Sequence, residues 1–232
     1  MIRLLQRMDD AEPRLPASGE STPSKLRIVT VLAGAKEAET EAVEDFARGL
    51  EWVRWLLAGI RRQNLAIHCR PVNTTRAGAA HAVWADFGRQ HLTRSLRSHF
   101  LRAWKAASKG DLQAVIDADK AFTATLAEEE SARSSQAGQL LLQATRHARY
   151  QGWLGRYRGS CQAGESPGHF LTVWAGVAHF FQLSLASAAA EYLRLEWEIL
   201  TWNLPGATMP EDLPSLASRM IEASQVELRL VE

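Results

Sequence analysis

A run of apolar residues near the end of the chain constrains the fold more than any other feature. Residues 170–181, FLTVWAGVAHFF, are apolar nearly all the way round a helix of that length. Such a helix must be buried in a core or at an interface, because an exposed helix keeps one polar face. A second stretch of mixed but strongly apolar character follows over residues 185–200. We expect the first stretch to be core and the second to lie partly at an interface.

From residue 81 onward the pattern favours helices throughout, which predicts an all-α fold, a bundle of about five helices. Gly110 is a helix stop, and Asp111 after it is an N-cap, because its side chain accepts a hydrogen bond from a free amide of the first turn. The expected helices are 83–109, as one helix or a broken pair, 111–149, 170–181, 185–200 and 216–230, with a glycine-rich loop over 150–167.

The first 80 residues differ in character from the rest. Residues 1–24 are rich in Pro, Ser, Gly and Glu, a composition that buries too little apolar surface to order itself, and are expected to be linker or disordered. The short stretches 26–32 and 65–72 predict strands on either side of a helix over 35–62. We therefore expect an irregular N-terminal segment over 1–80 and an all-helical domain over 81–232.

Composition excludes several classes of protein. Among 232 residues, 27 are Lys or Arg and 26 are Asp or Glu, a balance that gives no support to binding nucleic acid or an anionic membrane. Two cysteines are too few for a disulfide scaffold or a cysteine-rich zinc module. No apolar run reaches the roughly 18 residues of a membrane span, and the N-terminus turns acidic too early for a signal peptide. We expect a cytoplasmic protein.

Catalytic motifs are mostly absent. The sequence has no P-loop, dinucleotide fingerprint, nucleophile elbow or zincin helix. The histidines are expected to be surface or capping residues, and the paired carboxylates at 117 and 119 and at 196 and 198 to lie on solvated faces. Four tryptophans on expected helices are expected to be core, namely Trp52, Trp55, Trp104 and Trp197.

Residues 146–158 combine arginines with tyrosine and tryptophan. Arginine beside aromatic rings suits single-stranded nucleic acid, but the same residue types anchor protein interfaces. Because the net charge is only +1, we favour a protein interface.

Four stretches share a pattern of small residues and helix signals with one known family. Residues 110–143 place Ser134, then Gly138 and leucines, after a Glu-rich stretch, and residues 168–193 run from His-Phe through an apolar helix to an Ala-rich segment and Tyr-Leu. A turn at 202–206, WNLPG, and a closing ELRL at 227–230 complete the set. Over roughly residues 83–232 the chain thus resembles the UreF family of urease accessory proteins, whereas the first 80 residues lack the family's Gly-Phe and His-Ser segments.

The resemblance implies a helical bundle of the UreF type that acts as a non-enzymatic chaperone in nickel insertion. Such a protein would bind a UreD/UreH-type accessory protein, dock onto apo-urease, and recruit and regulate a UreG-type GTPase. It would form a homodimer and bind no cofactor, with nickel handled by the complex rather than held tightly by this chain. By resemblance, the partner-binding or scaffold residues are Ser134, Gly138, His169, Phe170, Asn203, Arg229 and Leu230.

Two other functions compete with this one. A helical enzyme or ligand-binding regulator would have a pocket lined by Trp153, Tyr157 and His169, with a shifted histidine pKa. A nucleic-acid-binding protein would use residues 146–158 and would lose affinity steeply with salt.

Overall fold

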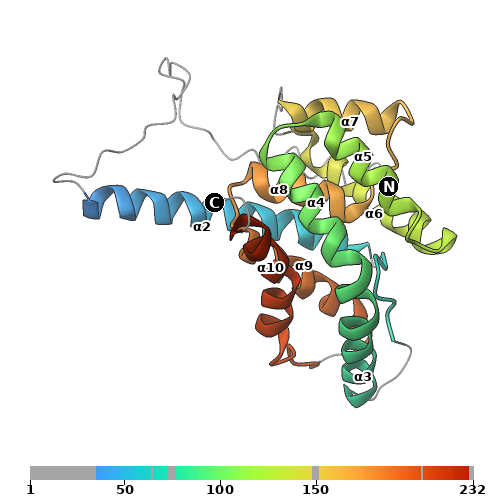
Figure 1. Ribbon diagram of the computed structural model, residues 1–232. Helices are drawn as coiled ribbons and strands as arrows, with labels where there is room; N and C mark the ends of the chain where they lie inside the picture. Colours follow the sequence, from blue (N-terminus) through green and yellow to red (C-terminus); the bar gives the residue numbers. More distant parts are fainter. Residues whose placement is uncertain (1–34, 64, 73–76, 148–151, 205, 230–232) are drawn as a thin grey trace, which may run out of the picture. The chain divides into compact units, whose positions relative to one another are not determined.

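The computed structural model describes residues 35–63, 65–72, 77–147, 152–204 and 206–229, and these residues form helices and connections with no strand (Figure 1). Residues 42–232 belong to one unit, and of the preceding 41 residues the structure describes the first turns of the helix that begins at Ala35. The all-α prediction is therefore confirmed. No helix of the described residues is long and apolar enough to cross a membrane. The expected strand over 26–32 lies outside the described residues.

The elements follow one another along the chain with short connections. They are α2 (Ala35–Arg62), α3 (Ala77–Phe87), the π-helix η1 (Gly88–Leu96), α4 (Arg97–Ser108), α5 (Leu112–Thr123), α6 (Glu128–Ala144), the 3₁₀ turn η2 (Thr145–His147), α7 (Trp153–Gln162), α8 (Phe170–Phe180), α9 (Leu185–Leu200) and α10 (Leu213–Arg229).

Helix α8 is at the centre of the core. Every residue from Phe170 to Ala178 is buried, and the helix packs against α4, α5, α6 and α9 (Figure 1). The Trp174 indole donates a hydrogen bond to the Ala188 carbonyl at 3.0 Å, which joins α8 to α9. An apolar helix with no polar face thus lies where its sequence requires.

The expected helix over 83–109 consists of three segments in direct succession. Helices α3 and α4 are joined by η1, in which the Arg97 amide donates to the Leu92 carbonyl, five residues back. A π-helical segment widens the turn and changes which side chains share a face. Helix α4 ends just before Gly110, as predicted, and Gly110 has a positive φ of 65°. Asp111 then caps α5, because its side chain accepts a hydrogen bond from the Ala114 amide at 3.0 Å.

The prediction of a strand over 65–72 is wrong. The segment is irregular, and its amides bond to α9 rather than to another strand. The Cys69 amide donates to the Glu196 carboxylate at 3.0 Å, and the Val72 amide donates to the Leu200 carbonyl at 3.0 Å. These bonds satisfy backbone groups that a sheet would otherwise pair.

The expected loop over 150–167 is also wrong, because α7 occupies residues 153–162. Glycines at 155 and 159 lower the helix propensity of this segment. Leu154 and Tyr157, three residues apart on one face, are 2% and 0% exposed. Burial of this face against α5 outweighs the weak local preference.

Candidate functional site

A carboxylate inside the protein fixes the loop that leads into α8. Asp119, on α5, has no solvent exposure. Its Oδ2 accepts from the Ser166 hydroxyl and the Gly168 amide, each at 2.7 Å, and its Oδ1 accepts from the His169 amide at 3.1 Å. Gly168 turns the chain here with a φ of 71°, which glycine adopts at no steric cost. Asp119 therefore ties the start of α8 to α5.

Two small residues of α6 meet the same loop. The Ser134 hydroxyl accepts a hydrogen bond from the Phe170 amide at 3.3 Å. One turn later, a Cβ on Gly138 would lie 2.9 Å from the His169 carbonyl carbon and 2.9 Å from the Phe170 nitrogen. The backbones approach so closely that only a residue without a side chain fits. Four predicted residues thus meet at one junction between α6 and α8, while their part in partner binding stays a prediction.

The His169 imidazole lies between hydroxyl groups inside this junction. Its Nε2 is 2.9 Å from the Thr123 hydroxyl and its Nδ1 is 3.2 Å from the Ser135 hydroxyl. Burial lowers the pKa of His169, the Asp119 carboxylate raises it, and His68 lowers it further. Since the side chain is closed to solvent, it orders the entry to α8 rather than facing a ligand.

A second buried carboxylate joins α9 to the segment before α3. Glu196 has no exposure, and it accepts hydrogen bonds from the His68 amide at 3.3 Å and the Cys69 amide at 3.0 Å. The His68 Nδ1 lies 2.9 Å from Glu196 Oε1 and 2.8 Å from the Tyr192 hydroxyl. Burial first, and then Glu196, raise the pKa of both Cys69 and Tyr192.

The expectation of solvated carboxylates is therefore wrong for Asp119 and Glu196. The sequence did contain a signal. Asp119 lies on the apolar stripe of α5 between Val115 and Phe122, and Glu196 lies on that of α9 between Leu193 and Leu200. A carboxylate in such a stripe is turned toward the core, where it needs several donors.

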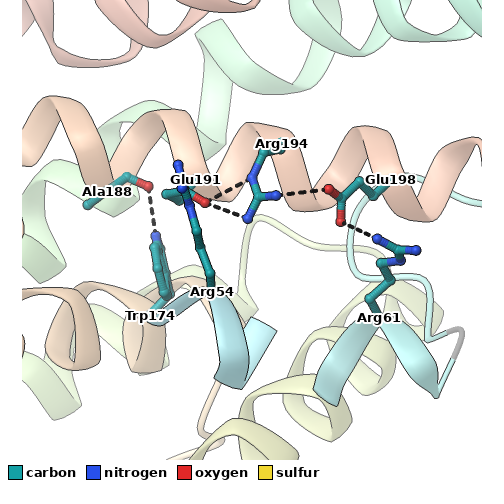
Figure 2. Close-up of polar contacts among 7 residues, drawn as sticks. All are labelled: Arg54, Arg61, Trp174, Ala188, Glu191, Arg194 and Glu198. Atoms are coloured by element: carbon teal, nitrogen blue, oxygen red, sulfur yellow. Dashed lines mark hydrogen bonds and ion pairs between the residues drawn. The ribbon is translucent and has the colours of Figure 1, made fainter. Parts of the chain in front are cut away.

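Charged side chains that range from buried to half-exposed link α2 to α9 (Figure 2). Arg54 donates to Glu191 through Nε at 3.0 Å and Nη2 at 2.7 Å. Arg194 bonds to both Glu191, at 2.9 Å, and Glu198, at 3.0 Å, and Arg61 donates to Glu198 at 3.3 Å. The hydrogen bonds to Glu191 are the largest cause that raises the pKa of Arg54. Because the pairs come in the same order along both helices, α2 and α9 run in the same direction.

The face of α2 that points away from the core carries two tryptophans. Trp52 and Trp55 are 48% and 46% exposed, and their rings meet edge to face with centroids 5.9 Å apart. Trp202 is 39% exposed, and the Arg61 Cζ lies over its ring, 5.8 Å from the ring centroid. The expectation that Trp52 and Trp55 are core is wrong, whereas Trp197 is buried as expected. Adjacent half-exposed indoles are typical of a protein interface.

Comparison with known families identifies the chain. The family model UreF matches residues 79–197, about half of the sequence, from α3 through most of α9. The chain belongs to the UreF family. No curated protein and no solved structure gave a match.

UreF proteins are urease accessory proteins, so membership assigns the chain a role in urease maturation. The matched segment contains the whole α6–α8 junction and both buried carboxylates. The turn at 202–206 and the closing ELRL, which also resemble the family, lie beyond it. The match begins at residue 79, and the division of the chain at residue 80 stays a prediction.

The alternative site, that of a helical enzyme or ligand-binding regulator, has no support in the geometry. Tyr157 and His169 are both fully buried, and the Trp153 ring is packed so closely on α8 that a Cβ on Gly176 would lie 2.7 Å from it. Burial first, and then Asp119, raise the pKa of Tyr157. A hollow of about 350 Å³ lies elsewhere, between α4 and α5, and is lined by residues that include Arg102, Lys105 and Asp117. In the described part of the chain, no three His, Cys, Asp or Glu side chains are grouped to hold a metal ion.

The remaining predicted residues lie near the C-terminus. Asn203 is exposed in the turn after α9. Arg229 is the last residue of α10, but the placement of its side chain and of Leu230 lies outside what the structure describes. Of the basic aromatic segment, Arg156 is exposed on α7, and residues 148–151 are outside the described part.

Proposed function

We propose that the chain is a non-enzymatic scaffold in urease maturation, which binds a UreD/UreH-type accessory protein and regulates a UreG-type GTPase during nickel insertion into apo-urease. The observation that carries the proposal is the UreF match over residues 79–197. In this function the chain acts in the cytoplasm as a homodimer, and nickel passes through the complex without a tight site on this chain. The buried side chains at the alternative site agree with a protein that works through its surfaces.

The partner-facing surface of this proposal is the outer face of α2. Trp52 and Trp55 offer a large apolar area on a regular helix, which is anchored by its buried face, including Val53 and Leu57, with ion pairs to α9 at its edge. Aromatic side chains on a pre-ordered element lose little entropy when a partner covers them. Asn203, Arg229 and Leu230 are proposed as further contacts, while Ser134, Gly138, His169 and Phe170 keep the scaffold in shape.

Binding of the purified chain to its cognate UreD/UreH-type and UreG-type proteins tests the proposal by calorimetry and size-exclusion chromatography. We expect a stable complex with the wild-type chain, and affinity reduced about tenfold or more in the Trp52→Ala/Trp55→Ala variant. Val83→Ala is the matched control, because Val83 is also an exposed apolar helical residue, at 42%, but on α3. The melting temperatures of both variants should remain close to that of the wild type, since surface changes cost little stability.

Cells that lack the gene give the functional test. Urease there should stay largely without nickel and regain activity when the gene is restored. Normal urease activation in the deletion strain would contradict the proposed function. If the complex forms and its affinity is the same in the Trp52→Ala/Trp55→Ala variant, only the assignment of the outer face of α2 as the partner-binding surface is contradicted.

A further inference from the structure

Three histidines from separate parts of the chain surround one phenylalanine in the core. The His99 ring, on α4, stacks on Phe122 of α5 with centroids 3.8 Å apart and planes 4° apart. His169, at the start of α8, meets the same ring edge to face at 5.4 Å, and His68, before α3, does so at 6.0 Å. His99 and His169 are 6% and 0% exposed, and the His68 side chain is 4% exposed. Charge on one imidazole therefore acts on the others through the buried interior, where electrostatic screening is weak.

Neutral imidazoles satisfy the hydrogen bonds of two members of this cluster, His99 and His169. The His99 Nε2 lies 2.8 Å from the Thr172 hydroxyl of α8, and the two nitrogens of His169 face the hydroxyls of Thr123 and Ser135. A hydroxyl both donates and accepts, so it serves either tautomer of a neutral ring. None of these three partners carries a charge that would balance a proton on His99 or His169.

The charged and titratable groups that face the cluster give it few counter-ions. Asp119 of α5 is near His169, but its oxygens already accept from three donors. Arg102, on α4 itself, lowers the pKa of His99. From α9, Glu196 and the Tyr192 hydroxyl face His68, next to Cys69, and from α8 no titratable side chain occurs between residues 170 and 178.

A proton on His169 has a further cost. His169 is the N-cap residue of α8, where the helix dipole presents its positive end. The amides that hold this end in place belong to residues 168, 169 and 170, which donate to Asp119 and Ser134. Positive charge at this point opposes the same docking that those bonds maintain.

We propose that His99 and His169, stacked around Phe122, form an acid-sensitive latch that keeps the N-terminal end of α8 docked on α5 and α6 while both rings are neutral. Acidification adds charges that the interior cannot balance, and the end of α8 separates from the junction before the rest of the bundle unfolds. The latch is a property of the fold and does not depend on the proposed function.

The direction of the pH effect follows from the two histidines. Burial is the main cause that lowers the pKa of each, whereas an unfolded histidine titrates near 6.5. Repulsion from His169, His68 and Arg102 lowers the pKa of His99 further, whereas for His169 the Asp119 carboxylate raises the pKa in part and His68 lowers it. The docked form is therefore fully favoured above about pH 6.5 and loses population as the pH falls below that value toward the folded pKa values. Each histidine changes the equilibrium by at most about tenfold per pH unit in this window, and both together by at most about a hundredfold.

Hydrogen exchange of the full chain, followed by mass spectrometry between pH 7.5 and 5.5, tests the latch. After correction for intrinsic exchange rates, protection of amides 168–173 should fall by about tenfold to a hundredfold. Protection over 213–221 of α10 should change less than about threefold. The double variant His99→Gln/His169→Gln, which keeps hydrogen-bonding side chains without an imidazole, should lose the pH dependence.

His91→Gln is the matched control, because His91 is exposed on η1 and stacks on Phe87 at 6.2 Å outside the cluster. It should keep the wild-type profile. A flat profile at 168–173 in the wild type, or an unchanged profile in the double variant, would overturn the latch. If the double variant does not fold, the wild type decides, since loss of protection spread evenly over all helices would overturn the proposal and loss confined to 168–173 would support it.

Discussion

A close approach of two backbones, at Gly138, gives the sharpest stability prediction. A Cβ added at Gly138 would lie 2.9 Å from the His169 carbonyl carbon and from the Phe170 nitrogen, and nearer still to the Gly168 carbonyl oxygen. These are main-chain atoms of a loop held by Asp119, so no flexible side chain can move aside. In Gly138→Ala, α6 and α8 must therefore separate.

The magnitude follows from two opposing effects. Overpacking in a well-packed interior costs about 1–3 kcal/mol, and contacts with fixed backbone favour the upper end of that range. Alanine gains about 1 kcal/mol over glycine in a helix. The net loss in free energy of unfolding should be about 2 kcal/mol, which lowers the melting temperature of a chain of this size by roughly 4–8 °C.

Thermal unfolding followed by circular dichroism measures this loss. Gly159→Ala is the control, because Gly159 lies on α7 with no atom within 4 Å of its added Cβ, so that variant should gain up to about 1 kcal/mol. If Gly138→Ala were as stable as the wild type, the close contact of α6 with α8 would not exist in solution and the reasoning would fail.

Three further predictions concern charges and thiols. Asp119→Ala should lose at least about 3 kcal/mol in denaturant unfolding, because three donors lose their buried acceptor, whereas the exposed Asp117→Ala should stay within about 0.5 kcal/mol. Arg54→Ala should cost less than about 1 kcal/mol in the same assay, since its side chain is 52% exposed and Arg194 still pairs with the carboxylate; a larger loss would show that this ion pair is essential to the bundle. Burial raises the pKa of Cys161 to about 12. At pH 8 iodoacetamide should therefore alkylate this thiol at least about a hundredfold more slowly than the thiol of an unfolded cysteine. An alkylation rate near that of the denatured chain would show that the Cys161 thiol is not shielded in this way.

Helix periodicity and end signals in the sequence predicted most of the bundle. The segments 170–181 and 185–200 agree with α8 and α9 to within one residue, because each has an apolar pattern that only burial satisfies. Gly110 and Asp111 mark a helix boundary through local backbone chemistry, which no tertiary contact overrides here.

Tertiary contacts determine the parts of the structure that the sequence pattern did not predict. Helix α7 forms in a glycine-rich segment because Leu154 and Tyr157 are buried, which no local pattern of this segment reveals. The segment 65–72 has a strand-like composition but finds Glu196 and the end of α9 instead of a neighbouring strand. Among the candidate site residues, small side chains pointed to the α6–α8 junction, whereas Asp119 was missed because its donors, two main-chain amides and the Ser166 hydroxyl, lie 47 to 50 residues away in the sequence.

The nine π-helical residues of η1, between α3 and α4, set the rotation of α3 relative to α4. Trp84 on α3 meets Trp197 of α9 with ring centroids 5.5 Å apart, while α4 packs on α8. Each residue of an α-helix advances by about 100°, whereas a residue of a π-helix advances by less because each turn holds more residues. The angle at which α3 presents Trp84 to α9 therefore depends on how many residues of this segment are wound in the wider turn.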